Sequence, residues 1–168
     1  MTEQKAETKA KAKGETKESK GENGWNPSIV VFACNWCSYA GADTAGVSRF
    51  QHQPYFRIIR VMCSGRIQPG FVLKAFEKGA DGVLVSGCHF GDCHYIFGNE
   101  RAVEQFEKTM SMVKLLGIDE GRLRLEWISA AEGNRFAQVI NEFTDQVRYL
   151  GPSPFNPTKT RDGVKQKE

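Results

Sequence analysis

Residues 28–33 read Ser28-Ile-Val-Val-Phe-Ala33, a short apolar run rich in β-branched side chains. Such a run is typical of a strand buried on both faces of a sheet. Two further runs of this kind follow along the chain, Phe56–Met62 and Gly82–Ser86. A fourth segment, Arg122–Ile128, alternates polar and apolar residues, which predicts a half-exposed edge strand.

The segments between these runs carry helical patterns. Apolar residues at three- and four-residue spacing from Val103 to Gly117 and from Phe136 to Leu150 predict two long helices. A shorter helix is expected at Pro69–Lys78, where Pro stands early in the segment. Ser129-Ala-Ala-Glu132 matches a capping box that would open the last helix. The Gly- and Ala-rich segment 39–50 carries the weakest pattern.

Strands that alternate with helices imply right-handed βαβ crossovers. We therefore predict a single α/β domain, residues 25–150, with about four mostly parallel strands. Residues 1–24 are almost entirely Lys, Glu, Thr, Ala and Gly, so we expect a disordered charged tail. Residues 151–168 begin with a Pro-rich stretch and end in a charged tail.

The chain contains five cysteines, and all of them fall within residues 34–93: Cys34, Cys37, Cys63, Cys88 and Cys93. The first pair follows the first predicted strand, the single cysteine follows the second, and the last pair follows the third. Parallel strands present their carboxyl ends at one edge of a sheet, where ligands bind. The sequence thus predicts that three loops bring all five thiols to that edge.

Charge and hydropathy exclude several classes of protein. Residues 25–150 hold thirteen basic and thirteen acidic residues, and only the two ends are mildly basic, so nucleic-acid binding is not expected. No apolar run approaches the ~20 residues of a membrane span. The N-terminus lacks the apolar core of a secretory signal. We expect a cytoplasmic protein whose clustered thiols serve metal or redox chemistry.

Four thiolates can hold an iron–sulfur cluster or a structural zinc ion, so one of the five would be spare. Zinc sites usually pair two short knuckles, whereas Cys88 and Cys93 have a wider C-x4-C spacing. A thiol–disulfide oxidoreductase using Cys34 and Cys37 is the other alternative, because a C-x-x-C pair after a strand is typical of that class. His89 and His94 are expected to be packing residues or hydrogen-bond donors beside the site, and His52 an ordinary loop histidine.

Other residues near the predicted edge are candidates for contact with partners. Arg57, Arg60 and Arg66 could meet a partner or an anion, although a solvated face is the commoner explanation. The aromatic candidates for docking are Trp36, Tyr39, Phe90 and Tyr95. No Gly-rich phosphate loop, Ser/His/Asp order or carboxylate pair indicates substrate chemistry, which favours an electron relay without turnover of its own.

Four motifs resemble one known family, the delta subunit of methyl-viologen-reducing hydrogenase: Cys34-Asn-Trp-Cys-Ser-Tyr-Ala-Gly-Ala-Asp43, Arg60-Val-Met-Cys-Ser-Gly-Arg66, Gly87-Cys-His-Phe-Gly-Asp-Cys-His-Tyr95 and Glu126-Trp-Ile-Ser-Ala-Ala-Glu132. The resemblance covers about residues 29–150. It implies a small 2Fe–2S protein that links a nickel–iron hydrogenase or a formate dehydrogenase to the flavin subunit of heterodisulfide reductase. Electron bifurcation in methanogenesis would be its setting.

The resemblance includes all five cysteine positions and does not say which four bind the cluster. We expect Cys63, Cys88 and Cys93 to be ligands, because each loop must contribute. Cys37 would be the fourth ligand and Cys34 the spare thiol.

Overall fold

The structure is a computed structural model that describes residues 25–156. The predictions for residues 1–24 and 157–168 lie outside the described residues. Four strands and four helices alternate along the chain: β1 (Ile29–Cys34), α1 (Ser38–Val47), β2 (Phe56–Val61), α2 (Pro69–Glu77), β3 (Gly82–Gly87), α3 (Gly98–Leu115), β4 (Leu123–Trp127) and α4 (Gly133–Leu150). Two short 3-10 turns precede α2 and β4: η1 (Ser64–Arg66) and η2 (Glu120–Arg122).

The strands form one parallel sheet in the order β2-β1-β3-β4. In the register, Ile29 of β1 stands between Phe56 of β2 and Gly82 of β3. The predicted α/β fold with βαβ crossovers is confirmed, and β4 is an edge strand as its alternating pattern predicted.

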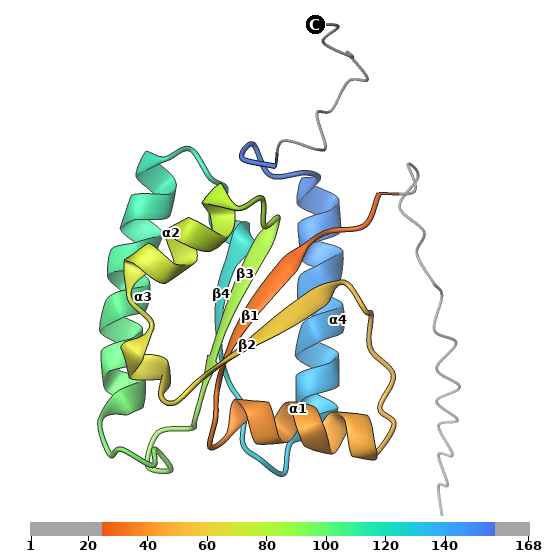
Figure 1. Cartoon of the computed structure of the whole chain (residues 1–168), viewed down its shortest axis with the longest axis vertical. Coiled ribbons are helices and arrows are strands. Elements are labelled where there is room, and N and C mark those ends of the chain that lie inside the picture. The colour runs from red at the N-terminus through yellow and green to blue at the C-terminus, as the bar shows by residue number, and fades with distance from the viewer. Residues whose placement is uncertain (1–24, 157–168) are drawn as a thin grey trace, which may run out of the picture.

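Helices cover both faces of the sheet, giving three layers (Figure 1). On one face, α1 and α4 pack over a buried cluster that includes Val31, Leu84 and Phe136. On the other, α2 and α3 pack over a second cluster that includes Phe32 and Val85. Because β1 and β3 are buried on both faces, their sequences are continuous apolar runs.

Some boundaries differ from the prediction. The capping box is misplaced: α4 begins at Gly133, and no side chain caps its N-terminus. The Glu132 carboxylate still accepts the Ser129 N–H at 2.7 Å, which is half of the predicted interaction. α3 begins at Gly98, a turn before the first apolar residue of its pattern at Val103. The weakly patterned segment 39–50 contains most of α1.

A buried polar network closes the amino end of the sheet, opposite the cysteine edge. Asp81 is fully buried and its carboxylate accepts the N–H groups of Ser28 and Ser153 at 2.8 and 2.9 Å. The buried Arg122 guanidinium donates to the carbonyl oxygens of Asp81 and Gly151. These bonds hold the residues after α4 against the start of β3.

Candidate metal centre

The site lies at the carboxyl edge of the sheet, where the strand order reverses between β1 and β3. Such a switch point leaves a crevice in which α/β proteins bind their ligands. Cys34 is the last residue of β1 and Cys88 directly follows β3. Their Sγ atoms are 3.7 Å apart, and both side chains are buried.

The other three thiols reach the same edge from three different loops. Cys37 precedes α1, Cys63 precedes η1 after β2, and Cys93 lies in the loop before α3. Cys37 interacts with Cys88, and Cys63 interacts with Cys93. The predicted convergence of the five thiols is confirmed: Cys88 lies beside both Cys34 and Cys37, and Cys63 lies beside Cys93.

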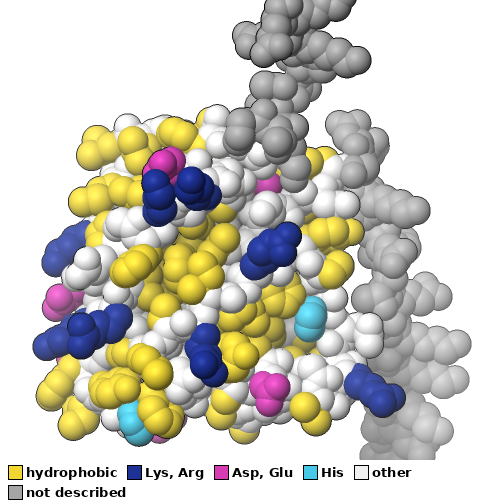
Figure 2. Space-filling model, in the orientation of Figure 1, with side chains coloured by type: hydrophobic (Ala, Val, Ile, Leu, Met, Phe, Trp, Pro, Cys, Tyr) yellow, Lys and Arg dark blue, Asp and Glu magenta, His cyan; other side chains and the backbone are white. Residues whose placement is uncertain are grey.

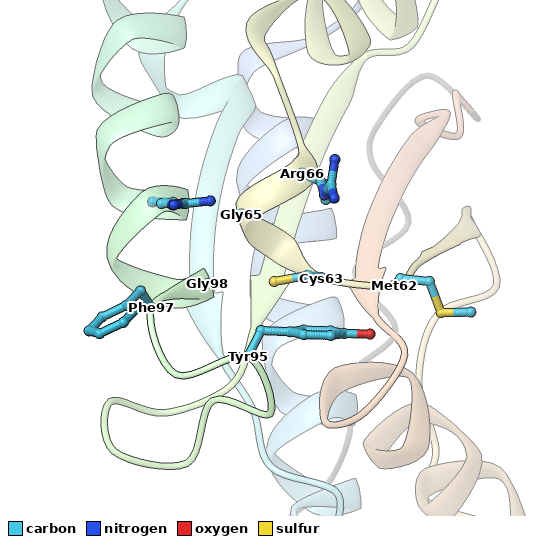
Figure 3. A pocket seen from close by; sticks show the side chains of 8 residues that line it. Met62, Cys63, Gly65, Arg66, Tyr95, Phe97 and Gly98 are labelled. Atoms are coloured by element: carbon cyan, nitrogen blue, oxygen red, sulfur yellow. The ribbon is translucent and has the colours of Figure 1, made fainter.

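Gly98, the first residue of α3, makes room for the second pair. A Cβ atom at this position would overlap the Cys63 Sγ and lie 2.9 Å from the Cys93 Sγ. The sequence pattern missed this residue because apolar spacing begins only at Val103. Cys63 also lines a cavity of about 280 Å³ beside Tyr95. Figure 3 shows the Cys63 sulfur pointing toward Gly98, with the Tyr95 ring below it.

Two further glycines allow the cysteine loops to approach each other. A Cβ on Gly65 would lie 2.6 Å from the Gly98 carbonyl oxygen, so η1 and α3 touch through backbone. A Cβ on Gly87 would lie 2.6 Å from the Ser64 Oγ. The Gly65 N–H donates to the Cys63 sulfur. Gly91 has a φ of +89°, which favours glycine in its turn.

Hydrogen bonds distribute charge unequally over the thiols. The Cys88 thiol and the backbone N–H groups of Trp36, Cys37 and Ser64 lower the pKa of Cys34 to about 6, against the opposing effect of burial. The same hydrogen bond, followed by burial, raises the pKa of Cys88. In the metal-free protein, Cys34 therefore loses its proton at a lower pH than Cys88.

At the thiols beyond this pair, burial is the largest influence on the pKa. It raises the pKa of Cys37 and of Cys63, with the charges of neighbouring cysteines as a further cause. A bound cation would lower these values, because coordination favours deprotonated thiols. The metal-free site thus holds protons that metal binding would release.

Aromatic residues cover the outer side of the site. The Trp36 indole stacks on the His94 imidazole with ring centroids 3.8 Å apart, and its Nε1 donates to the Tyr95 hydroxyl at 3.3 Å. Phe90 packs edge-on against Trp127. Trp36 directly precedes Cys37, and His94 directly follows Cys93. The stack therefore holds the first and third cysteine loops together.

The histidines take the roles expected of neighbours rather than of ligands. His94 packs on Trp36, and the His89 Nε2 lies 2.7 Å from the Glu132 carboxylate. The Ser129 N–H and then His89 lower the pKa of Glu132. His52 packs edge-on against Phe56 in a loop.

Within residues 25–156, no three His, Cys, Asp or Glu side chains form a ready-made site for a single metal ion. The donor set is nevertheless suited to an iron–sulfur cluster, because thiolates are its usual ligands. Gly98 contributes to the fit by leaving space beside two of the sulfur atoms.

A sequence profile of the methyl-viologen-reducing hydrogenase delta subunit matches residues 29–151, the whole folded region from β1 to the end of α4. The chain belongs to this family. It is 54% identical over 128 residues to the iron-sulfur subunit of an F420-non-reducing hydrogenase (vhc) of Methanococcus voltae, covering 76% of this chain and 89% of the relative. It is 50% identical over 131 residues to the corresponding iron-sulfur subunit of Archaeoglobus profundus, covering 78% and 96%.

Another relative is much longer. The chain is 52% identical over 126 residues, 75% of its length, to a component of the ferredoxin/F420H2-dependent CoB-CoM heterodisulfide reductase of Methanosarcina acetivorans. The match covers 16% of that protein. The delta-subunit domain therefore occurs both as a short chain and within a heterodisulfide reductase polypeptide. None of the helices in residues 25–156 is long and apolar enough to cross a membrane.

Proposed function

We propose that this chain is a 2Fe–2S electron-transfer subunit. It would relay electrons from a nickel–iron hydrogenase or a formate dehydrogenase to the flavin subunit of heterodisulfide reductase, in the cytoplasm. The observation that carries the proposal is the convergence of five thiols at the switch point of the sheet. Relatives with about half of their aligned residues identical are iron-sulfur subunits of hydrogenases by name.

The proposed ligands are Cys37, Cys63, Cys88 and Cys93. A 2Fe–2S cluster takes two cysteines on each iron, and the interactions of Cys37 with Cys88 and of Cys63 with Cys93 provide two such pairs. Cys34 is the spare thiol in this proposal. It is the last residue of β1 rather than part of a loop, and it is buried.

When bound, the cluster supplies one-electron redox chemistry at the carboxyl edge. The surrounding residues would keep water from the sulfur atoms and orient the cysteine loops. Trp36 stacked on His94 covers one side, and Phe90 against Trp127 covers another. The Gly65 N–H at Cys63 is the kind of hydrogen bond that tunes a reduction potential.

The fused relative supports the choice of acceptor. A domain that occurs within a heterodisulfide reductase polypeptide in Methanosarcina acetivorans would, as a separate chain, dock on the equivalent protein. Trp36, Tyr39, Phe90 and Tyr95 are exposed around the site, as predicted. They could make the apolar contacts of such an interface.

Analysis of iron and acid-labile sulfide in anaerobically purified protein tests the cluster, together with electron paramagnetic resonance after reduction with dithionite. Two irons and two sulfides per chain, with a signal from one unpaired electron, are expected. If the protein contains zinc and no labile sulfide, the cluster proposal is wrong and the site is a structural zinc site.

Thiol–disulfide exchange is the second candidate, favoured by the lowered pKa of Cys34. The Cys34 sulfur lies 3.7 Å from that of Cys88, so the exchanging pair would be Cys34–Cys88 rather than Cys34–Cys37. Cys34 is only 1% exposed, which would keep a disulfide substrate away from it. Reduction of insulin disulfides by metal-free protein would support this candidate.

A further inference from the structure

The free edge of the sheet at β2 runs directly toward the cysteine site. β2 pairs only with β1 in the sheet, so its other side faces outward. The strand ends at Val61, two residues before Cys63. A chain that paired with this edge would therefore have one of its ends beside the candidate metal centre.

The hydrogen bonds between β1 and β2 show which backbone groups of β2 point away from β1. Ile29 N–H donates to the Tyr55 carbonyl and Asn35 N–H to the Val61 carbonyl. In a parallel ladder, alternate residues turn both their N–H and C=O groups to one neighbour. Odd-numbered residues of β2 thus face β1, while Phe56, Ile58 and Arg60 turn their backbone groups outward. No hydrogen bond in residues 25–156 uses these groups.

The side chains at this edge are apolar and positively charged. Ile59 is 46% exposed and Met62, just beyond the strand, 61% exposed. Phe71 of α2 is 56% exposed and packs on Phe32, the β1 residue that pairs with Ile59. Figure 2 shows apolar side chains among Lys and Arg on the face that has β2 in front.

The charges on β2 are of one sign. Arg57 and Arg60 have no ion-pair partner in the described part of the chain, although Arg60 lies over the Tyr39 ring. β2 contains no acidic residue. Pairing of β2 with a second copy of itself would bring only positive side chains together, which is destabilising.

We propose that β2 binds an extended, acidic segment of a partner protein as a fifth strand of the sheet. Side chains opposite each other in a ladder interact directly, so the segment would carry carboxylates three residues apart, opposite Arg57 and Arg60. The two residues between them would be apolar and meet Ile58 and Ile59. Main-chain hydrogen bonds would supply affinity and the charges would supply selectivity.

Charged residues on an edge strand commonly prevent pairing with other chains. In β2, Arg57 and Arg60 lie on either side of the exposed Ile59. Their charges would exclude basic segments from this edge and favour acidic ones. The proposal rests on the proposed function only in taking the partner to be a component of the electron-transfer assembly.

Hydrogen exchange of the full chain with a synthetic peptide tests the proposal. The probe is acetyl-Thr-Glu-Val-Val-Glu-Thr-amide, and its counterpart replaces both Glu by Lys. The acidic peptide should slow exchange of the N–H groups of Phe56, Ile58 and Arg60 and leave those of Arg57 and Ile59, already bonded to β1, unchanged. No added protection at millimolar peptide, or equal protection by both peptides, would overturn the proposal.

A charge-reversed chain provides the second arm. With Arg57→Glu and Arg60→Glu together, preference should invert by about tenfold in favour of the Lys peptide. Lys108→Glu on α3 is the matched control and should keep the original preference. A reversed chain that still prefers the acidic peptide would also overturn the proposal.

Iron and labile sulfide are measured on the same samples. If the chain contains two irons but does not bind the acidic peptide, the strand-docking proposal is wrong and the proposed function stands. If the anaerobically purified chain binds the acidic peptide but contains no iron, the proposed function is wrong and the strand-docking proposal stands.

Discussion

The Sγ atoms of Cys34 and Cys88 lie 3.7 Å apart at the point where the strand order of the sheet reverses. The two residues are 54 positions apart in sequence. They meet because β1 and β3 are adjacent parallel strands that end at one edge. This pair forms the inner side of the candidate metal centre, and the loops carrying the other thiols lie around it.

Replacement of single cysteines by serine should identify the spare thiol. Cys34→Ser is expected to keep two irons per chain, because Cys34 is not one of the proposed ligands. Cys37→Ser, Cys63→Ser and Cys93→Ser should each lower the iron content severalfold. Iron and labile-sulfide analysis of the four variants measures this, and loss of iron in Cys34→Ser with retention in Cys37→Ser would exchange their roles.

Gly98→Ala should disrupt the site without removing a ligand. The added methyl group would overlap the Cys63 sulfur and crowd that of Cys93, so iron content should fall severalfold. Gly70→Ala is the matched control, since Gly70 also lies in the first turn of a helix and has open space around its Cα. Equal iron in the two variants would show that the sulfur atoms do not need this space.

The stack of Trp36 on His94 should contribute to stability. Aromatic pairs are worth about 0.5–1.5 kcal/mol beyond the area they bury. A double-mutant cycle with Trp36→Ala and His94→Ala should give a coupling free energy in this range, measured by urea unfolding of the metal-free protein. Additive effects would mean that the stack does not join the two loops.

Asp81→Ala should destabilise the fold far from the site. The variant leaves the N–H groups of Ser28 and of the buried Ser153 without their acceptor, at a cost of about 3 kcal/mol in the free energy of unfolding. Asp145→Ala removes an exposed carboxylate and should cost less than about 0.5 kcal/mol. The iron content of refolded Asp81→Ala should be normal, because the network lies at the opposite end of the sheet.

The stability of the metal-free protein should depend on pH through the Cys34–Cys88 pair. The pKa of Cys34 is about 6 in the fold against 9.0 for an unperturbed thiol, so between these values the unfolded chain binds more protons. Stability from this group therefore rises with pH over that range. Above it, the raised pKa of Cys88 means that the folded chain holds the extra proton, and stability falls.

Urea unfolding at several pH values measures this profile. In Cys88→Ala, the rise in stability between the two pKa values of Cys34 should weaken, because the side chain that hydrogen-bonds to Cys34 is lost. Ultraviolet absorbance of the thiolate offers an independent reading of the Cys34 titration. An unchanged profile in Cys88→Ala would contradict the assignment of the hydrogen bond.

Much of the site was predictable from the chain. Apolar runs such as residues 28–33 identify buried parallel strands, and Cys34, Cys63 and Cys88 follow three of them. Since parallel strands end at one edge, their convergence needed no coordinates. The alternating pattern of residues 122–128 likewise predicted an edge strand.

Other features depend on packing between segments that are remote in sequence. The order β2-β1-β3-β4 places Cys34 beside Cys88, and no local pattern encodes which strands become neighbours. The capping box failed because Glu132 precedes the helix and pairs with His89 from another loop. Gly98 was missed because its role is to leave space for two distant sulfur atoms.

The sequence by itself thus determined the strands, the helices and the edge to which the thiols belong, since these follow from local periodicity and chain direction. Only the tertiary structure decided the pairing of the thiols, the aromatic cover and the free edge at β2. These depend on strand order and on contacts across many residues, which a linear pattern does not contain.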